Sequence, residues 1–138
     1  MTDRHAIEAA VMQLYDHRNR ADMNAMLACL HPECRFRIAG TERLGAFTKV
    51  ADNHDAIRES VSALVADWDL SSLENVSLNV DGNTVFVHRA GSVRHIPTSV
   101  SFNTEFMEKI SFKDGKISEY IQFIDTYHVA GIVGLISI

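Results

Sequence analysis

The chain has 138 residues, of which 46% are hydrophobic and 22% are charged, and its formal net charge is −5. A chain of this length and composition is expected to bury enough apolar surface to fold as a single domain, residues 1–138, without a metal ion or a disulfide. The acidic balance and the lack of any block of like charges argue against nucleic-acid binding.

Neither the cysteines nor the histidines show a metal-binding pattern. Cys29 and Cys34 form a lone C-x4-C with no second pair, and no HExxH or i, i+4 histidine pair occurs. No phosphate-binding loop or dinucleotide motif is present, so no cofactor is expected. The N-terminus lacks the apolar stretch of a signal peptide, and the apolar segment 130–138 is too short to span a bilayer. We therefore expect a cytoplasmic protein that binds no membrane.

The first half of the chain predicts three helices and one strand. Asp3 is predicted to cap an amphipathic helix whose apolar stripe runs from Ile7 to Leu14, with Tyr15 beside it. Asp22 is predicted to cap a short second helix that ends at His31-Pro32. A strand with Cys34, Phe36 and Ile38 on one face follows, then a loop over 40–52. Asn53 is predicted to cap a third helix, whose inward stripe extends from Ile57 to Trp68.

The remainder of the chain, after Trp68, is predicted to be strand throughout. Segments 76–80 and 84–90 flank the turn Asp81-Gly82-Asn83, and segments 99–112 and 116–127 flank Asp114-Gly115. Helices followed by hairpin-joined strands indicate an α+β fold with a curved, largely antiparallel sheet. The three helices are predicted to cover its concave face.

Several local motifs, in this order and spacing, resemble one known family. They are the segments 21–26, 30–36, 54–57, 112–117 and 124–126. Together they resemble the nuclear transport factor 2-like superfamily, in particular its branch of SnoaL-like polyketide cyclases and ketosteroid isomerases. The resemblance covers roughly residues 3–128. It implies a cone-shaped sheet around a cavity for a small, mostly apolar molecule, while the fold alone does not fix the function.

Glu108 stands in the middle of the apolar row of a predicted strand. A carboxylate in such a place must be ion-paired, protonated or exposed in a cavity. By the resemblance, Glu108 falls where ketosteroid isomerases place a protonated Asp, and Tyr15 matches their tyrosine donor, so the two would form an oxyanion hole. The alternatives are a salt bridge between Glu108 and Arg89, a strand bulge that turns Glu108 outward, and an ordinary core role for Tyr15.

The general base of the isomerases has no counterpart here, because Ile38 occupies its position and Arg37 lies beside it. Asp125 is one candidate acid or base. Alternation puts Asp125 on the opposite face from Tyr120, Gln122 and Ile124, which the comparison with the isomerases places inward. Asp125 would then face the cavity only through a bulge; otherwise it would cap the end of the strand or contribute to a dimer interface.

His88 and Arg89 are adjacent on one predicted strand, so only one of them can face the cavity. An inward Arg89 would pair with Glu108 and hold it ionised. An inward His88 would be a candidate base with a useful pKa. The sequence leaves both options open.

The leading hypothesis is a small-molecule acid–base enzyme of the isomerase, cyclase or dehydratase type, with Tyr15, Glu108, Asp125 and His88 as candidate catalytic residues. A non-catalytic ligand- or partner-binding domain is the alternative, and the small subunit of an oxygenase is a third possibility. The apolar residues Ile121, Phe123 and 132–138 predict a homodimer. The residues expected to contact the substrate are Phe36, Ile38, Trp68, Arg89, Phe106, Tyr120, Gln122 and Ile124.

Overall fold

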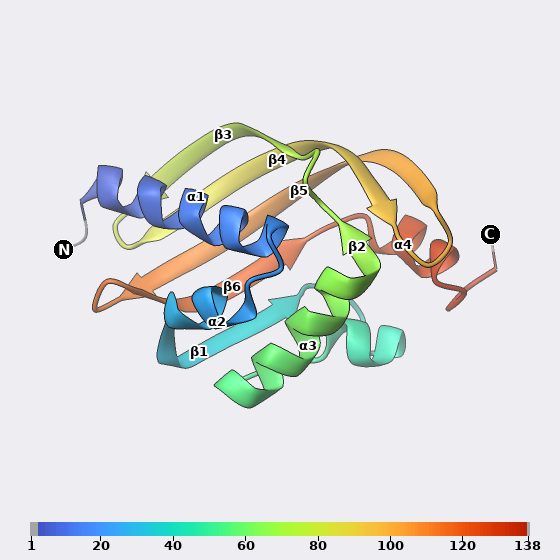
Figure 1. The fold of residues 1–138 in the computed structure, drawn as a ribbon, viewed down its shortest axis with the longest axis horizontal. Helices are drawn as coiled ribbons and strands as arrows, with labels where there is room; N and C mark the ends of the chain where they lie inside the picture. The colour runs from blue at the N-terminus through green and yellow to red at the C-terminus, as the bar shows by residue number, and fades with distance from the viewer. Residues whose placement is uncertain (1–2, 138) are drawn as a thin grey trace.

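A computed structural model describes residues 3–137 as a strongly curled sheet with helices on its concave face. Figure 1 shows the first three helices lying across that face and the last helix at the same end of the molecule as the C-terminus. In chain order the elements are α1 (Arg4–Asn19), α2 (Met23–Ala28), β1 (Leu30–Ile38), η1 (Glu42–Thr48), α3 (His54–Asp67), β2 (Trp68–Asp69), β3 (Glu74–Asp81), β4 (Thr84–His95), β5 (Val100–Lys113), β6 (Lys116–Phe123) and α4 (Thr126–Ile132).

The three predicted helices form, and two of them use the expected caps. The Asp22 carboxylate accepts a hydrogen bond from the Ala25 amide at 3.0 Å, and the Asn53 side chain accepts one from the Ala56 amide at 2.8 Å. Asp3 takes the N-cap position of α1 without making a side-chain cap bond. The helices place their apolar stripes against the sheet, where they form one large core cluster with β1, β4, β5 and β6.

The sheet is mixed, with the strand order β1-β6-β5-β4-β2, and β3 pairs with β4 beside β2. β1 and β6 run parallel, and the pairs β2–β4, β3–β4, β4–β5 and β5–β6 are antiparallel. Both predicted hairpins are present. Asp114 and Gly115 have φ values of 54° and 75°, which is the conformation of the tight turn that suits the twist of two antiparallel strands.

Gly91 lies in the middle of β4, where the chain before β3 crosses close to the sheet. Its φ is +146°, and a Cβ atom at this position would lie 2.7 Å from the carbonyl oxygen of Ser72. Glycine is therefore required for both its backbone conformation and the close approach. This contact holds the segment between β2 and β3 against the middle of the long strand.

Several predicted boundaries and one predicted loop differ from the structure. β1 begins at Leu30 instead of Cys34, so His31 and Pro32 belong to the strand. A 3-10 helix, η1, lies within the predicted loop. The last strand ends at Phe123 instead of Tyr127, and α4 follows it. The helix α4 covers a second apolar cluster, formed with Trp68 and Val93, at the end of the sheet where β2 pairs with β4.

Candidate functional site

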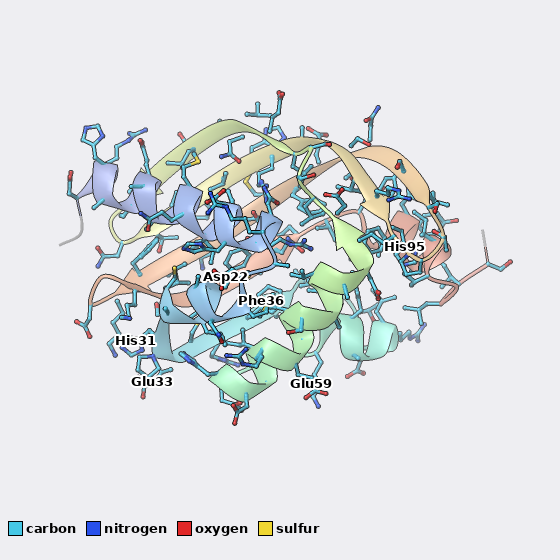
Figure 2. All side chains as sticks on the ribbon, in the orientation of Figure 1. Asp22, His31, Glu33, Phe36, Glu59 and His95 are labelled. Atoms are coloured by element: carbon cyan, nitrogen blue, oxygen red, sulfur yellow. The ribbon has the colours of Figure 1, made fainter. Side chains whose placement is uncertain are left out.

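A mostly apolar cavity of about 100 Å³ lies between the helices and the concave face of the sheet. Residues of α1, α2 and α3 form one wall, residues of β1, β4, β5 and β6 form the other, and Val129 of α4 lies at one end. Figure 2 shows Phe36, a wall residue of β1, in the space between α2 and α3 in this view. The polar side chains on the wall are Tyr15, Arg18, Asn19, Arg89, Thr104, Tyr120, Gln122 and Asp125.

Glu108 is fully buried behind this wall, at 0% exposure, and it accepts hydrogen bonds on both oxygens. The Tyr15 hydroxyl donates to Oε1 at 2.6 Å, and Nη1 of Arg89 lies 3.4 Å from the same atom. The Tyr120 hydroxyl donates to Oε2, and Nε2 of Gln122 donates to Oε2 at 2.9 Å. All four partners are donors, which is the partner set of a carboxylate and not of a carboxylic acid.

Register explains why these side chains meet. Glu108 pairs with Val87 on β4 and with Gln122 on β6, so that Gln122 lies directly across the strand from it. Arg89 is two residues beyond Val87 and Tyr120 is two residues before Gln122, and both therefore share the inward face. Tyr15 reaches the same point from α1.

Arg89 faces the cavity, and His88 does not. The guanidinium of Arg89 is 3.8 Å above the centroid of the Tyr15 ring and pairs with Glu108, while its Nε is buried without a partner among the described residues. His88 lies on the convex face, where its Nε2 is 2.8 Å from the Glu105 carboxylate. The structure therefore excludes His88 as a base in this cavity, and the neutral-acid interpretation of Glu108 gives way to the ion-pair alternative.

The two tyrosines at Glu108 retain their protons at physiological pH. Burial, followed by the nearby negative charge of Glu108, raises the pKa of Tyr15 and of Tyr120 well above its usual value. Each hydroxyl still has acceptor capacity after donating to Glu108. The tyrosines can therefore receive a hydrogen bond from a ligand while they donate to the carboxylate.

Asp125 lies at the end of the cavity next to α4, where it is the N-cap of that helix. Its Oδ1 accepts a hydrogen bond from the His128 amide at 3.0 Å, and its side chain is exposed. The strand ends before Asp125, and therefore no bulge is needed to bring it to the rim. Of the two structural roles considered for Asp125, capping and a dimer contact, the observed hydrogen bond is that of a cap.

Arg18 is a cavity residue that the sequence analysis missed. It lies in the last turn of α1, and its Nη2 donates to the Leu64 carbonyl oxygen at 3.2 Å. Burial lowers the pKa of its guanidinium. The position i+3 from Tyr15 places it on the same helix face, and this spacing was the signal that could have found it.

The remaining predicted substrate contacts lie on the cavity wall. These are Phe36, Ile38, Trp68, Phe106, Tyr120, Gln122 and Ile124. Ile38 is 2% exposed, and this position of the wall therefore has an aliphatic side chain and no carboxylate. Within residues 3–137 no group of three potential metal ligands was found, and no helix there has the length and hydropathy needed to cross a membrane.

The polar part of the wall is rich in hydrogen-bond donors and has few groups that could accept a proton from a ligand. The four donors to Glu108 use the lone-pair directions of its two oxygens, so a ligand proton can reach this carboxylate directly only by displacing one of them. A route through Tyr120 needs no displacement, since the hydroxyl can pass its own proton to Glu108 and take one from the ligand. The remaining N–H groups can stabilise negative charge on a ligand oxygen.

Comparisons with known proteins agree on one family. The family model described as the SnoaL-like domain matches residues 11–120. A nuclear transport factor 2-like protein of unknown function from Burkholderia pseudomallei is similar over 100% of both chains, with 18% identity and a TM-score of 0.80. No curated protein sequence matches the chain.

Two further solved structures are similar in fold. An isomerase candidate from Bacillus subtilis is 17% identical with a TM-score of 0.82, and the match covers 99% of this chain and 98% of that one. TerC, co-crystallised with polyporic acid, is 17% identical with a TM-score of 0.77, over 94% of this chain and 98% of that one.

Proposed function

This chain belongs to the SnoaL-like family, and we propose that it binds a small, largely apolar molecule in its cavity and catalyses an acid–base reaction on it. The reaction would be of the isomerase, cyclase or dehydratase type. The single observation that carries the proposal is the fully buried Glu108, whose four donors converge beside an apolar cavity. Such a group is expensive to bury, and the pKa values of the two tyrosines that donate to it are strongly raised, a property that is concentrated at functional sites.

In the proposed mechanism, Tyr120 exchanges protons between the ligand and Glu108. A proton released by the ligand passes to the Tyr120 oxygen while the Tyr120 proton moves to Oε2 of Glu108. The negative charge that develops on a ligand oxygen is stabilised by the N–H groups of Gln122 and Arg89 that line the same wall. Arg89 compensates the charge of Glu108 in the resting state.

Three similar structures support a small-molecule ligand. Similar structures from Bacillus subtilis and Rhodopseudomonas palustris are described as isomerase candidates, and TerC was co-crystallised with an organic acid. The identities are between 14% and 17%, and the likeness therefore supports the fold directly and the activity only by analogy.

A non-catalytic ligand-binding role is the second candidate, and one observation favours it. Ile38 occupies the position of the base in the isomerases, and the four hydrogen bonds to Glu108 are satisfied within the protein itself. A binding protein would use the same donors to hold a ligand oxygen without transferring a proton.

Proton exchange with solvent separates the two candidates. Small enolisable ketones incubated with the protein in D₂O would incorporate deuterium next to the carbonyl, which ¹H NMR detects. We expect Tyr120→Phe to slow the exchange by roughly 10²–10⁴-fold. His88→Ala, on the opposite face of the same sheet, should leave the rate unchanged. Ligand binding with no exchange in the wild type would support the non-catalytic role.

We also propose a homodimer formed through the convex face of the sheet. Met107 and Phe123 are opposite each other there and are 42% and 45% exposed. Lys109 and Glu119, which pair at 3.5 Å on the same two strands, give this face both signs of charge, so two copies can place unlike charges opposite each other across a two-fold axis. Analytical ultracentrifugation should find a dimer for the wild type and a monomer for Phe123→Glu; a monomeric wild type at micromolar concentration would contradict the proposal.

A further inference from the structure

We propose that Arg18 is an anion-recognition residue and that the ligand of this cavity is a small organic acid whose carboxylate, or a comparable anion, pairs with it. The inference rests on the proposed ligand-binding function and narrows the class of ligand. Arg18 lines the cavity from the last turn of α1, and among residues 3–137 no carboxylate lies within 4.0 Å of its guanidinium. Burial of this group is unfavourable without a partner.

Among the buried and half-buried charged groups that residues 3–137 place at the cavity, positive charges exceed negative charges by one. Arg18 and Arg89 both line the cavity, and Glu108 is the one buried carboxylate that faces them. The two other acidic groups near this wall, Asp69 and Asp125, are exposed. Asp69 accepts hydrogen bonds from the amide and hydroxyl of Ser71, and water screens its attraction for Arg18. An anionic ligand would balance the excess charge.

Of the two arginines, Arg18 is the one whose guanidinium can bind a ligand. Arg89 is 5% exposed, pairs with Glu108 and stacks on Tyr15, so its position is fixed. Arg18 is half-buried and has one hydrogen bond among the described residues, to the Leu64 carbonyl oxygen. A guanidinium has five N–H donors arranged to bind a carboxylate through two parallel hydrogen bonds.

The alternative role for Arg18 is to tie α1 to α3, because Leu64 lies in the last turn of α3. A tether of this kind would stabilise the fold, and the affinity for a ligand would then not depend on the charge of that ligand. The two roles therefore differ in one measurable property, which is the preference for an anionic over a neutral ligand of the same size.

The cavity volume limits the size of the acid. At about 100 Å³ the cavity is smaller than an engineered apolar cavity of about 150 Å³ that holds benzene, and well below the ~300–1,000 Å³ of pockets for drug-sized ligands. A short-chain acid therefore fits the cavity as it stands, and a single-ring acid requires the wall to move outward. The wall itself is apolar and aromatic, which suits a ring or an alkyl chain behind the carboxylate.

Phenylacetate and phenylacetamide are suitable probes, because they match in size and differ in charge. Trp68 is the single tryptophan of the chain and lies on the cavity wall, so its fluorescence, excited at 295 nm, reports occupancy of the cavity. Both probes are titrated at pH 7.5 with the ionic strength held constant by NaCl. We expect the wild type to bind phenylacetate at least tenfold more tightly than phenylacetamide.

Three arginine variants test the role of Arg18. Arg18→Gln should reduce the preference to less than twofold by weakening the binding of phenylacetate alone. Arg18→Lys retains the charge and should keep part of the preference. Arg20→Gln is the matched control, because this arginine lies two residues away at the C-cap of the same helix, with its side chain 71% exposed. This variant should bind both probes as the wild type does.

The outcomes distinguish this inference from the proposed function. If neither probe binds to the wild type, the cavity does not accept single-ring ligands and the inference is overturned, while the deuterium-exchange experiment judges the proposed function separately. If both probes bind equally, the inference alone is wrong. Equal weakening of both probes by Arg18→Gln would assign Arg18 to the tether. Should Arg18→Gln fail to fold, the wild-type preference and Arg18→Lys still decide the question.

Discussion

Replacing Glu108 with Gln tests whether the buried carboxylate is ionised and paired with Arg89. The change preserves the shape of the side chain but removes its charge, and it puts an NH₂ group in place of an oxygen that accepts from two donors. Arg89, at 5% exposure, is then left without a counter-charge. Breaking a buried pair in this way typically costs about 3–5 kcal/mol.

A loss of this size is readily measured. Urea unfolding followed by Trp68 fluorescence should show the free energy of unfolding of Glu108→Gln lowered by about 3–5 kcal/mol. For a chain of this length the melting temperature should fall by roughly 10–20 °C. Glu105→Gln is the matched control: Glu105 lies on the same strand but on the convex face, its side chain is 71% exposed, and its pair with His88 should contribute less than about 1 kcal/mol.

A second substitution isolates the ion pair from the other hydrogen bonds. In an Arg89→Met background Glu108 has lost the cation that pairs with it, so adding Glu108→Gln should cost about 1–2 kcal/mol less than it does in the wild type. The reasoning would be refuted if Glu108→Gln lost less than about 1 kcal/mol, or if the two substitutions were additive.

Three further predictions concern alkaline stability, backbone strain and thiol reactivity. The raised pKa values of Tyr15 and Tyr120 mean that the folded protein holds these two protons more tightly than the unfolded chain, so stability is fully present below about pH 10 and is lost above it. Urea unfolding at pH 9–11.5 should show this fall, and a smaller slope in Tyr15→Phe than in Tyr127→Phe, whose ring is 66% exposed. Gly91→Ala should destabilise by at least about 2 kcal/mol in the same assay, whereas Gly134→Ala, with φ +81° and open space around it, should cost less; equal losses would rule out the contact with Ser72 as the cause. Burial raises the pKa of the Cys34 thiol to about 12, so about one molecule in 10⁴ has the thiolate at pH 8, and mass spectrometry after iodoacetamide treatment should find Cys34 unmodified in the native protein.

The period-two pattern of strands accounts for the part of the site that the sequence predicts. Glu108 interrupts an apolar row, and that row faces the cavity because the core is on that side. The same alternation puts Tyr120, Gln122 and Ile124 on one face, so all three point inward if any one of them does. The hairpin turns are local signals, and they fix the order of the last strands.

Other features of the site depend on tertiary contacts, which local sequence patterns do not reveal. The rows containing His88 and Arg89 are both mixed in polarity, so only the register against β5 assigns Arg89 to the inside. Arg18 is a charged residue in the last turn of a helix, where a role at the helix dipole is the simplest interpretation. The helix α4 was missed because its apolar residues resemble a strand, although Asp125 before Thr126 is an N-cap signal.

The parallel pairing of β1 with β6 affects how the chain can be synthesised. β1 is complete when residue 38 has been made, but the strand beside it in the sheet begins only at residue 116. Tyr15 likewise cannot form its hydrogen bond until Glu108, 93 residues further along the chain, has been made. A ribosome therefore releases helices and a first strand whose apolar surfaces stay uncovered until nearly the whole protein has emerged. Contacts between such distant residues are slow to form, and nascent chains halted before β6 should depend on chaperones to remain unaggregated.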